Sequence, residues 1–143
     1  MSNDVILIVD DSKFIAQAYS RVLLDLGYRV LVACDGKTGI FAAESCRPNL
    51  ILLDMLMPDM DGVQVLRTLK RTPSTKDIPV LAISSLSEKN GTKLVQEGTS
   101  GYFEKGSMTQ DKLDLAISGI LKRRLLVPDD SEEAKEQIKR SVV

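Results

Sequence analysis

Short apolar runs alternate along the chain with longer segments in which apolar residues recur every three or four positions. The runs are rich in Val, Ile and Leu without polar alternation, which is typical of strands buried on both faces of a parallel sheet. The segments between them have the periodicity of helices with one apolar face. The pattern predicts strands at 5–9, 29–33, 50–53, 79–83 and 101–103. It predicts helices at 12–26, 36–46, 62–71, 88–97 and about 107–122.

Local signals support the helix boundaries. Gly27 ends the first helix, Ser107 and Gln110 have capping-box spacing, and Pro79 stands at the first position of its strand, where proline is tolerated. Asn90 and Gly91 weaken the fourth helix. The residues expected to face the core from the first helix are Ile15, Ala18, Val22 and Leu26. Those expected from the last helix are Leu113, Ala116, Ile117, Ile120 and Leu121.

Strict alternation of strands and helices predicts an α/β fold with a five-stranded parallel sheet and helices on both faces. Right-handed crossovers leave few topologies, and we expect a doubly wound (βα)5 arrangement in a single domain. The helical pattern ends near Lys122, so we place the domain at 1–124 and a charged C-terminal tail or linker at 125–143. In such sheets ligands bind beyond the carboxyl ends of the strands.

Composition excludes several classes of function. The chain has 143 residues, with 19 basic and 20 acidic side chains and a net charge of −1, so it has no electrostatic reason to bind nucleic acid or an anionic membrane. Its apolar runs are too short to span a bilayer. The absence of His removes the commonest general base and zinc ligand. Cys34 and Cys46 are expected to be buried free thiols of a reduced, cytosolic protein.

Polar residues with chemical potential stand at the carboxyl ends of four predicted strands. Asp10 and Asp11 follow the first, Asp54 the third, Ser84 the fourth and Lys105 the fifth. Each residue alone has a plainer interpretation, as a helix cap, a loop acid, a turn residue or a solvated lysine. Their convergence at one edge of the sheet favours a common site instead.

The charges of this group indicate a missing cation. Asp10, Asp11 and Asp54 with Lys105 sum to −2, which one divalent ion would cancel. Oxygen ligands without Cys or His favour Mg²⁺, or alternatively Mn²⁺, over zinc. Because Mg²⁺ often completes its shell with phosphate oxygens and an aspartate can act as the nucleophile in phosphoryl transfer, Asp54 is a candidate phosphate acceptor.

Four ordered motifs resemble the bacterial response-regulator receiver domain of two-component signalling, including its chemotaxis-regulator-like members. They are VDDS (9–12), LLDMLMPDMDG (52–62), DIPVLAISS (77–85) and GYFEKG (101–106), and the resemblance covers about residues 4 to 122. The resemblance implies a role for each matched site residue: phosphoacceptor Asp54; metal ligands Asp10, Asp11, Asp54 and the backbone carbonyl of Leu56; switch residues Ser84 and Tyr102; phosphate-contacting Lys105; and acceptor-turn residues Pro58 and Gly62.

Two features depart from the family pattern. Gly106 stands where the family usually has Pro after its lysine, so we expect a trans bond there. Leu56 and Leu86 occupy positions that are often polar in the family. Since neither side chain can orient a water molecule, we expect slow self-dephosphorylation.

The resemblance implies a flavodoxin-like fold and a phosphorylation-controlled switch. It would accept phosphate from a partner histidine kinase or His-phosphotransfer protein and act on a downstream protein through the face of helix 4, strand 5 and helix 5. We expect no direct nucleic-acid or membrane partner, a cytoplasmic location, and no enzymatic activity beyond self-phosphorylation from small donors and slow self-dephosphorylation. One alternative is a haloacid-dehalogenase-type phosphatase, although its second Asp is replaced by Leu56. The other is a receiver-like interaction module that never takes phosphate.

Overall fold

Five parallel strands form a single sheet in the computed structural model, which describes residues 3–84, 98–104 and 109–126. The strands are β1 (Val5–Val9), β2 (Arg29–Ala33), β3 (Leu50–Asp54), β4 (Val80–Ser84) and β5 (Gly101–Glu104). The described helices are α1 (Lys13–Asp25), α2 (Gly36–Cys46), α3 (Gly62–Arg71) and α5 (Gln110–Leu126). The strand order β2-β1-β3-β4-β5 confirms the predicted flavodoxin-like fold. The predicted helix at 88–97 lies outside the described residues.

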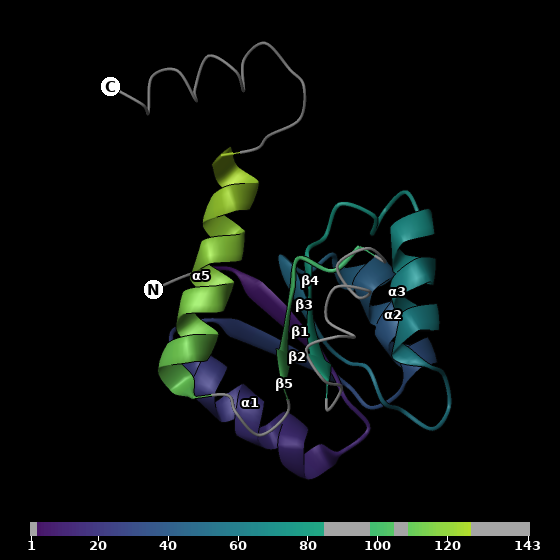
Figure 1. Cartoon of the computed structure of the whole chain (residues 1–143), viewed down its shortest axis with the longest axis horizontal. Helices are drawn as coiled ribbons and strands as arrows, with labels where there is room; N and C mark the ends of the chain where they lie inside the picture. The colour runs from purple at the N-terminus through teal and green to yellow at the C-terminus, as the bar shows by residue number, and fades with distance from the viewer. Residues whose placement is uncertain (1–2, 85–97, 105–108, 127–143) are drawn as a thin grey trace.

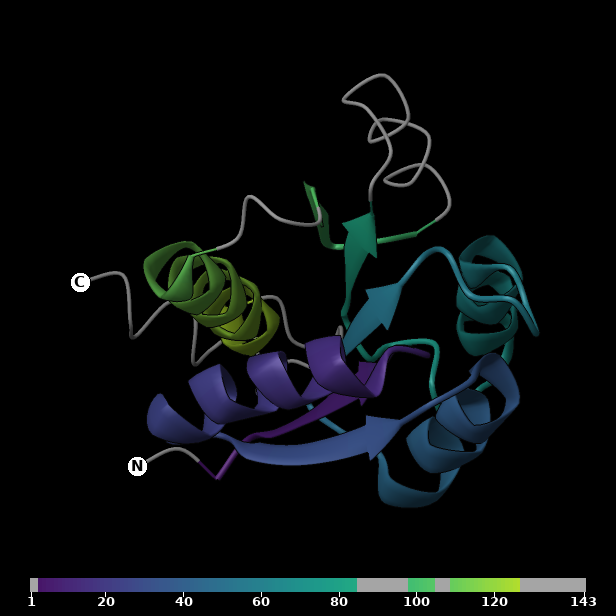
Figure 2. The same cartoon turned by 90° about the horizontal axis from the view of Figure 1, so that it is seen from below.

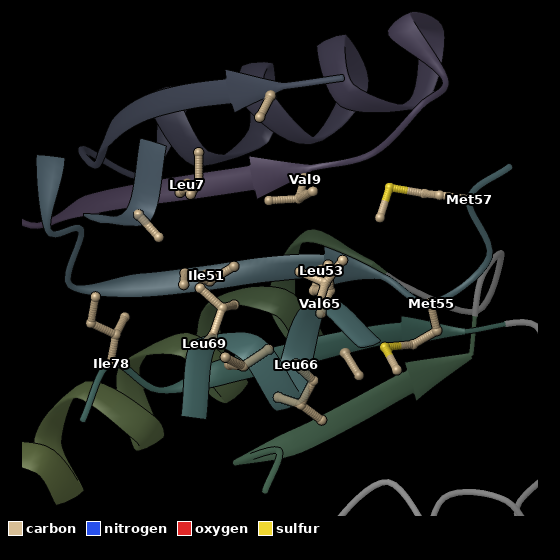
Figure 3. Close-up of a cluster of buried hydrophobic side chains, with 14 residues drawn as sticks. Leu7, Val9, Ile51, Leu53, Met55, Met57, Val65, Leu66, Leu69 and Ile78 are labelled. Atoms are coloured by element: carbon tan, nitrogen blue, oxygen red, sulfur yellow. The ribbon is translucent and has the colours of Figure 1, made fainter. Parts of the chain in front are cut away.

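Two helical layers cover the sheet, with α1 and α5 on one face and α2 and α3 on the other (Figures 1 and 2). Successive residues of a strand point to opposite faces, so each apolar run supplies both layers. In β3, Leu50 and Leu52 pack toward α1 and α5, whereas Ile51 and Leu53 pack toward α2 and α3. Figure 3 shows the second cluster, in which Leu66 and Leu69 of α3 close over the sheet. Burial of β3 on both faces makes it the centre of the fold.

Element boundaries differ from the prediction at a few ends. β4 begins at Val80 because Pro79 has no N–H to give to the ladder, although its carbonyl still accepts from the Ile51 amide at 3.0 Å. β3 continues to Asp54, and α5 continues to Leu126. Among the described residues the hydroxyl of Thr109 accepts from the Lys112 amide at the start of α5, and the expected cap Ser107 lies outside them.

The buried face of α1 differs from the predicted one. Ala16 and Leu23 are fully buried, Ile15, Val22 and Leu26 are half-buried at the flanks, and Ala18 is exposed. The expectation for Ala18 was therefore wrong, because it lies about 200° around the helix from Ala16. In α5 the prediction is confirmed, since Leu113, Ile117 and Ile120 are buried and Ala116 and Leu121 pack beside them.

The expectation of buried thiols was also wrong. Cys34 and Cys46 are free and exposed. Cys34 follows the edge strand β2, and Cys46 is the last residue of α2, so both lie where an element leaves the core. No helix in the described ranges is long and apolar enough to cross a bilayer.

Candidate functional site

Three carboxylates meet at the carboxyl edge of the two central strands. Asp10 directly follows β1, and its amide continues the ladder by donating to the Ala33 carbonyl at 3.1 Å. Asp54 is the last residue of β3, next to β1 in the sheet. Each of Asp10, Asp11 and Asp54 offers a carboxylate oxygen, and these oxygens lie within 4.8 Å of one another. The three acids therefore lie close together in space, as predicted.

Backbone amides hold the two buried carboxylates in place. Asp10 is 1% exposed, and its Oδ1 accepts from the amide of Ser12, the N-cap of α1, at 2.9 Å. Asp54 is 2% exposed, and its Oδ1 accepts from the Leu56 amide at 3.1 Å. Asp11 is exposed. The cluster therefore combines two fixed, buried acids with one that faces solvent.

The loop after Asp54 is held at both ends. The amide of Met55 donates to the Ile83 carbonyl at 2.9 Å, and the amide of Gly62 donates back to the Met55 carbonyl at 3.3 Å. A Cβ on Gly62 would lie 2.5 Å from the Met55 Cα, so only glycine fits this close approach. Asp61, the N-cap of α3, forms a capping box with Gln64. The family-like turn is thus fixed by backbone contacts.

Leu56 lies beside Asp54, and Tyr102 lies on the edge strand β5. The Leu56 side chain is 54% exposed beside Asp54, and its carbonyl as a metal contact stays a prediction. Tyr102 lies on β5, is half-buried and packs against the core on the α2 and α3 side. The backbone of Ser84 follows Ile83, the register partner of Asp54. The expected roles of Lys105, Gly106 and Leu86 fall outside the described residues.

Tyr19, on α1, is affected by the negative charge of the acid cluster. Its pKa is raised above the ordinary value, first by burial and then by the negative charges of Asp10 and Asp54. Sequence reasoning assigned Tyr19 no role. The direction of the pKa change agrees with Tyr19 lying close enough to the cluster for its negative charge to act on the phenol, in addition to burial.

The donor set of the cluster fits a hard divalent cation. Carboxylate oxygens of Asp10, Asp11 and Asp54 are the ligands that Mg²⁺ prefers, and no sulfur or imidazole donor belongs to the group. Three carboxylates this close repel one another, and a cation would offset that repulsion. Since Asp11 is exposed, the site also leaves room for the waters that Mg²⁺ usually keeps.

Known proteins that are similar to this chain in sequence are numerous. The DNA-binding dual master transcriptional regulator RpaA of Synechocystis is 31% identical over 131 residues, which cover 91% of this chain and 54% of that protein. The response regulator PleD of Caulobacter vibrioides is 37% identical over 102 residues, which cover 70% of this chain and 22% of that protein. The chain thus spans about half or less of the length of these two relatives.

Solved structures agree with the sequence comparison. The receiver domain of the Francisella response regulator 1452 superposes with a TM-score of 0.78 at 30% identity, covering 85% of this chain and 98% of that one. The chemotaxis protein CheY4 of Vibrio cholerae superposes with a TM-score of 0.77 at 27% identity, covering 83% and 99%. The response regulator receiver domain, as a family, matches residues 6–118. The chain belongs to the response regulator receiver domain family.

Proposed function

We propose that Asp54 accepts a phosphoryl group from a phosphohistidine of a partner histidine kinase or His-phosphotransfer protein. The observation that carries the proposal is the meeting of Asp10, Asp11 and Asp54 at the end of the central strands. An Asp54 oxygen would form the new P–O bond while the P–N bond breaks, and the leaving imidazole keeps the electron pair and takes a proton. The product is an aspartyl phosphate that stores the signal.

Asp10, Asp11, Asp54 and the Leu56 carbonyl would hold Mg²⁺, or alternatively Mn²⁺. The ion supplies positive charge opposite the transferring phosphoryl oxygens. Asp10 and Asp54 contribute preorganisation, because the amides of Ser12 and Leu56 already fix their carboxylates. By the family resemblance, Lys105 contacts the phosphoryl group and Ser84 donates its hydroxyl to it.

The output of the switch is a change in protein contacts. Phosphorylation adds roughly −1.5 to −2 charges, which would draw Ser84 inward and let Tyr102 follow. This would shift the balance between two packings of the face formed by the predicted helix 88–97, β5 and α5. The domain at 1–124 would act as this switch, with 125–143 as its tail or linker. It is not a turnover enzyme, apart from self-phosphorylation by small donors and slow self-dephosphorylation.

The proposal covers the receiver domain and not a whole regulator. RpaA is DNA-binding by name, but this chain covers only 54% of it, so we propose that the receiver itself works through proteins rather than nucleic acid. No membrane contact is part of the mechanism. A kinase partner that draws phosphate from ATP places the reaction in the cytoplasm.

Replacement of Asp54 tests the acceptor. Wild type incubated with a small phosphodonor and Mg²⁺ should gain the mass of one phosphoryl group, and Asp54→Asn should not, as measured by intact mass. Asp77→Asn is the matched control, since Asp77 is an exposed acid away from the cluster and its loss should leave the gain unchanged. An Asp54→Asn variant that gained the same mass at the same rate would contradict the assignment. Rapid release of inorganic phosphate without accumulation of the phosphorylated mass would instead favour the phosphatase alternative.

A further inference from the structure

Asp59, a residue to which the sequence analysis gave no role, connects the acceptor loop to α2. Both oxygens of its carboxylate accept from the amide of Gly36, the first residue of α2, at 3.0 and 3.3 Å. Asp59 lies in the loop between Asp54 and α3, so this contact joins segments 23 positions apart. It adds a polar attachment to the middle of the loop, where Met57 is buried in the core and Met60 packs against it.

The helix end that Asp59 reaches is already capped. Asp35 is the N-cap of α2, and its Oδ1 accepts from the Thr38 amide at 2.7 Å. Asp59 therefore satisfies a different amide, that of Gly36, and is not needed to begin the helix. Its contact serves the loop more than it serves α2.

The helix that receives Asp59 is packed against the strand that carries Asp10. A Cβ on Gly39 of α2 would lie 2.7 Å from a methyl group of Val9, the residue directly before Asp10. A Cβ on Gly36 would lie 2.9 Å from Met60 of the loop. Such close approaches leave α2 little freedom to move relative to β1. α2 is thus held in a fixed position relative to the side of the acid cluster that follows β1.

The two sides of the cluster are connected through this helix. Asp10 and Asp11 follow β1, against which α2 packs, and Asp54 and Leu56 begin the loop that Asp59 attaches to α2. Leu56 is restrained on one side by the hydrogen bond that its amide donates to Asp54 Oδ1 and, three residues later in the chain, by the contact of Asp59 with Gly36. The direction of the Leu56 carbonyl therefore depends on both restraints.

We propose that Asp59 is a positioning residue, which holds the acceptor loop in the geometry that binds the divalent cation. The inference rests on the proposed function, since it assumes Mg²⁺ bound by the cluster. Asp59 does not touch the cation or the phosphoryl group. It acts through the loop, by keeping the Leu56 carbonyl and the Asp54 carboxylate close to the acids that follow β1.

Removal of the carboxylate should loosen the loop without unfolding the protein. In Asp59→Ala the bonds of Met55 and Gly62 still hold the loop ends, so the fold persists while the middle of the loop samples more conformations. Partners that orient metal ligands typically contribute 10–100-fold to metal affinity, and we expect about tenfold weaker Mg²⁺ binding. Asp59→Asn keeps a carbonyl acceptor for Gly36 and should bind Mg²⁺ nearly as well as wild type.

Four full-length proteins make the test: wild type, Asp59→Ala, Asp59→Asn and Asp35→Ala. Mg²⁺ affinity is measured by calorimetric titration, and thermal unfolding is followed in EDTA. Asp35→Ala is the matched control, because it removes one negative charge and one hydrogen bond from the same helix end without touching the loop. The expected result is weak Mg²⁺ binding in Asp59→Ala alone, including when its melting temperature in EDTA equals that of Asp35→Ala.

Several results would overturn the inference. Wild-type affinity in Asp59→Ala would show that the loop needs no such restraint. Equal weakening in Asp59→Asn would assign the effect to charge, and equal weakening in Asp35→Ala would assign it to α2 in general. In each of these cases wild type still binds Mg²⁺, so the proposed function survives. A wild-type protein that bound no Mg²⁺ would overturn both proposals together.

Discussion

Replacing Asp10 by Asn should stabilise the protein in the absence of metal. Carboxylate oxygens of Asp10 and Asp54 lie within 4.8 Å of each other, and both residues are buried. At an effective dielectric constant of about 20, two unit charges at this separation repel by about 3 kcal/mol. The repulsion from exposed Asp11 is screened by solvent and adds less. Asn retains an oxygen that can accept from the Ser12 amide, so the start of α1 is preserved.

Part of that repulsion is relieved in the folded protein by the amide hydrogen bonds, so the expected gain for Asp10→Asn is about 1–3 kcal/mol in the free energy of unfolding. Bound Mg²⁺ should act in the opposite direction and stabilise wild type more than Asp10→Asn. At 100 times its dissociation constant a ligand stabilises the native state by about 2.7 kcal/mol, and Asp10→Asn should lose most of this increment.

Urea unfolding followed by circular dichroism, in EDTA and in Mg²⁺, measures both effects. Asp77→Asn serves as a control because it removes an exposed acid outside the cluster. A metal-free Asp10→Asn protein less stable than wild type would refute the idea that the carboxylates repel without a cation. An unchanged response to Mg²⁺ would remove Asp10 from the ligand set.

Three further predictions concern the surroundings of the site. Gly62→Ala should cost about 1–3 kcal/mol of stability, because its Cβ meets the Met55 Cα at 2.5 Å; an unchanged urea midpoint would contradict that close approach. Because the folded-state pKa of Tyr19 is raised, its contribution to stability is complete below its ordinary pKa of about 10 and is lost as pH rises through the folded value. Asp10→Asn should lower that pKa in an absorbance titration with the other two tyrosines changed to Phe, and no downward shift would argue against the charge effect. Leu56→Asn should shorten the lifetime of the phosphorylated protein, since Asn can orient an attacking water; equal lifetimes would mean that the leucine does not protect the phosphate.

The strands were predictable because their apolar runs are continuous. A run such as Leu50–Leu53 has no polar alternation, and the structure shows why, since its residues divide between two helical layers. The face that each residue takes was not predictable, because a continuous run has no period to reveal it. The error at Ala18 has a different origin, since α1 also carries exposed apolar residues such as Phe14 and Leu24, which blur the position of its buried face in the sequence.

The acid cluster was predictable for a different reason. Asp10 and Asp54 each follow an apolar run, and topology brings the carboxyl ends of neighbouring parallel strands together. The contact between Asp59 and Gly36 had no comparable signal, because it joins a loop to a helix end without any periodic pattern. The exposed cysteines show the opposite error, in which a preference of residue type was overruled by position at an element end.

The centre of the sheet is more deeply buried than its β5 edge. Every residue of β3 is buried, whereas β5 is half-buried and ends at exposed Glu104. Tyr102 and Phe103 of β5 pack into opposite core layers, so a change at this strand reaches both helical faces. Moving an edge strand disrupts fewer buried contacts than moving a central one, and such a change costs less free energy. The proposed site at Asp10 and Asp54 would therefore keep its geometry in a switch that moves β5.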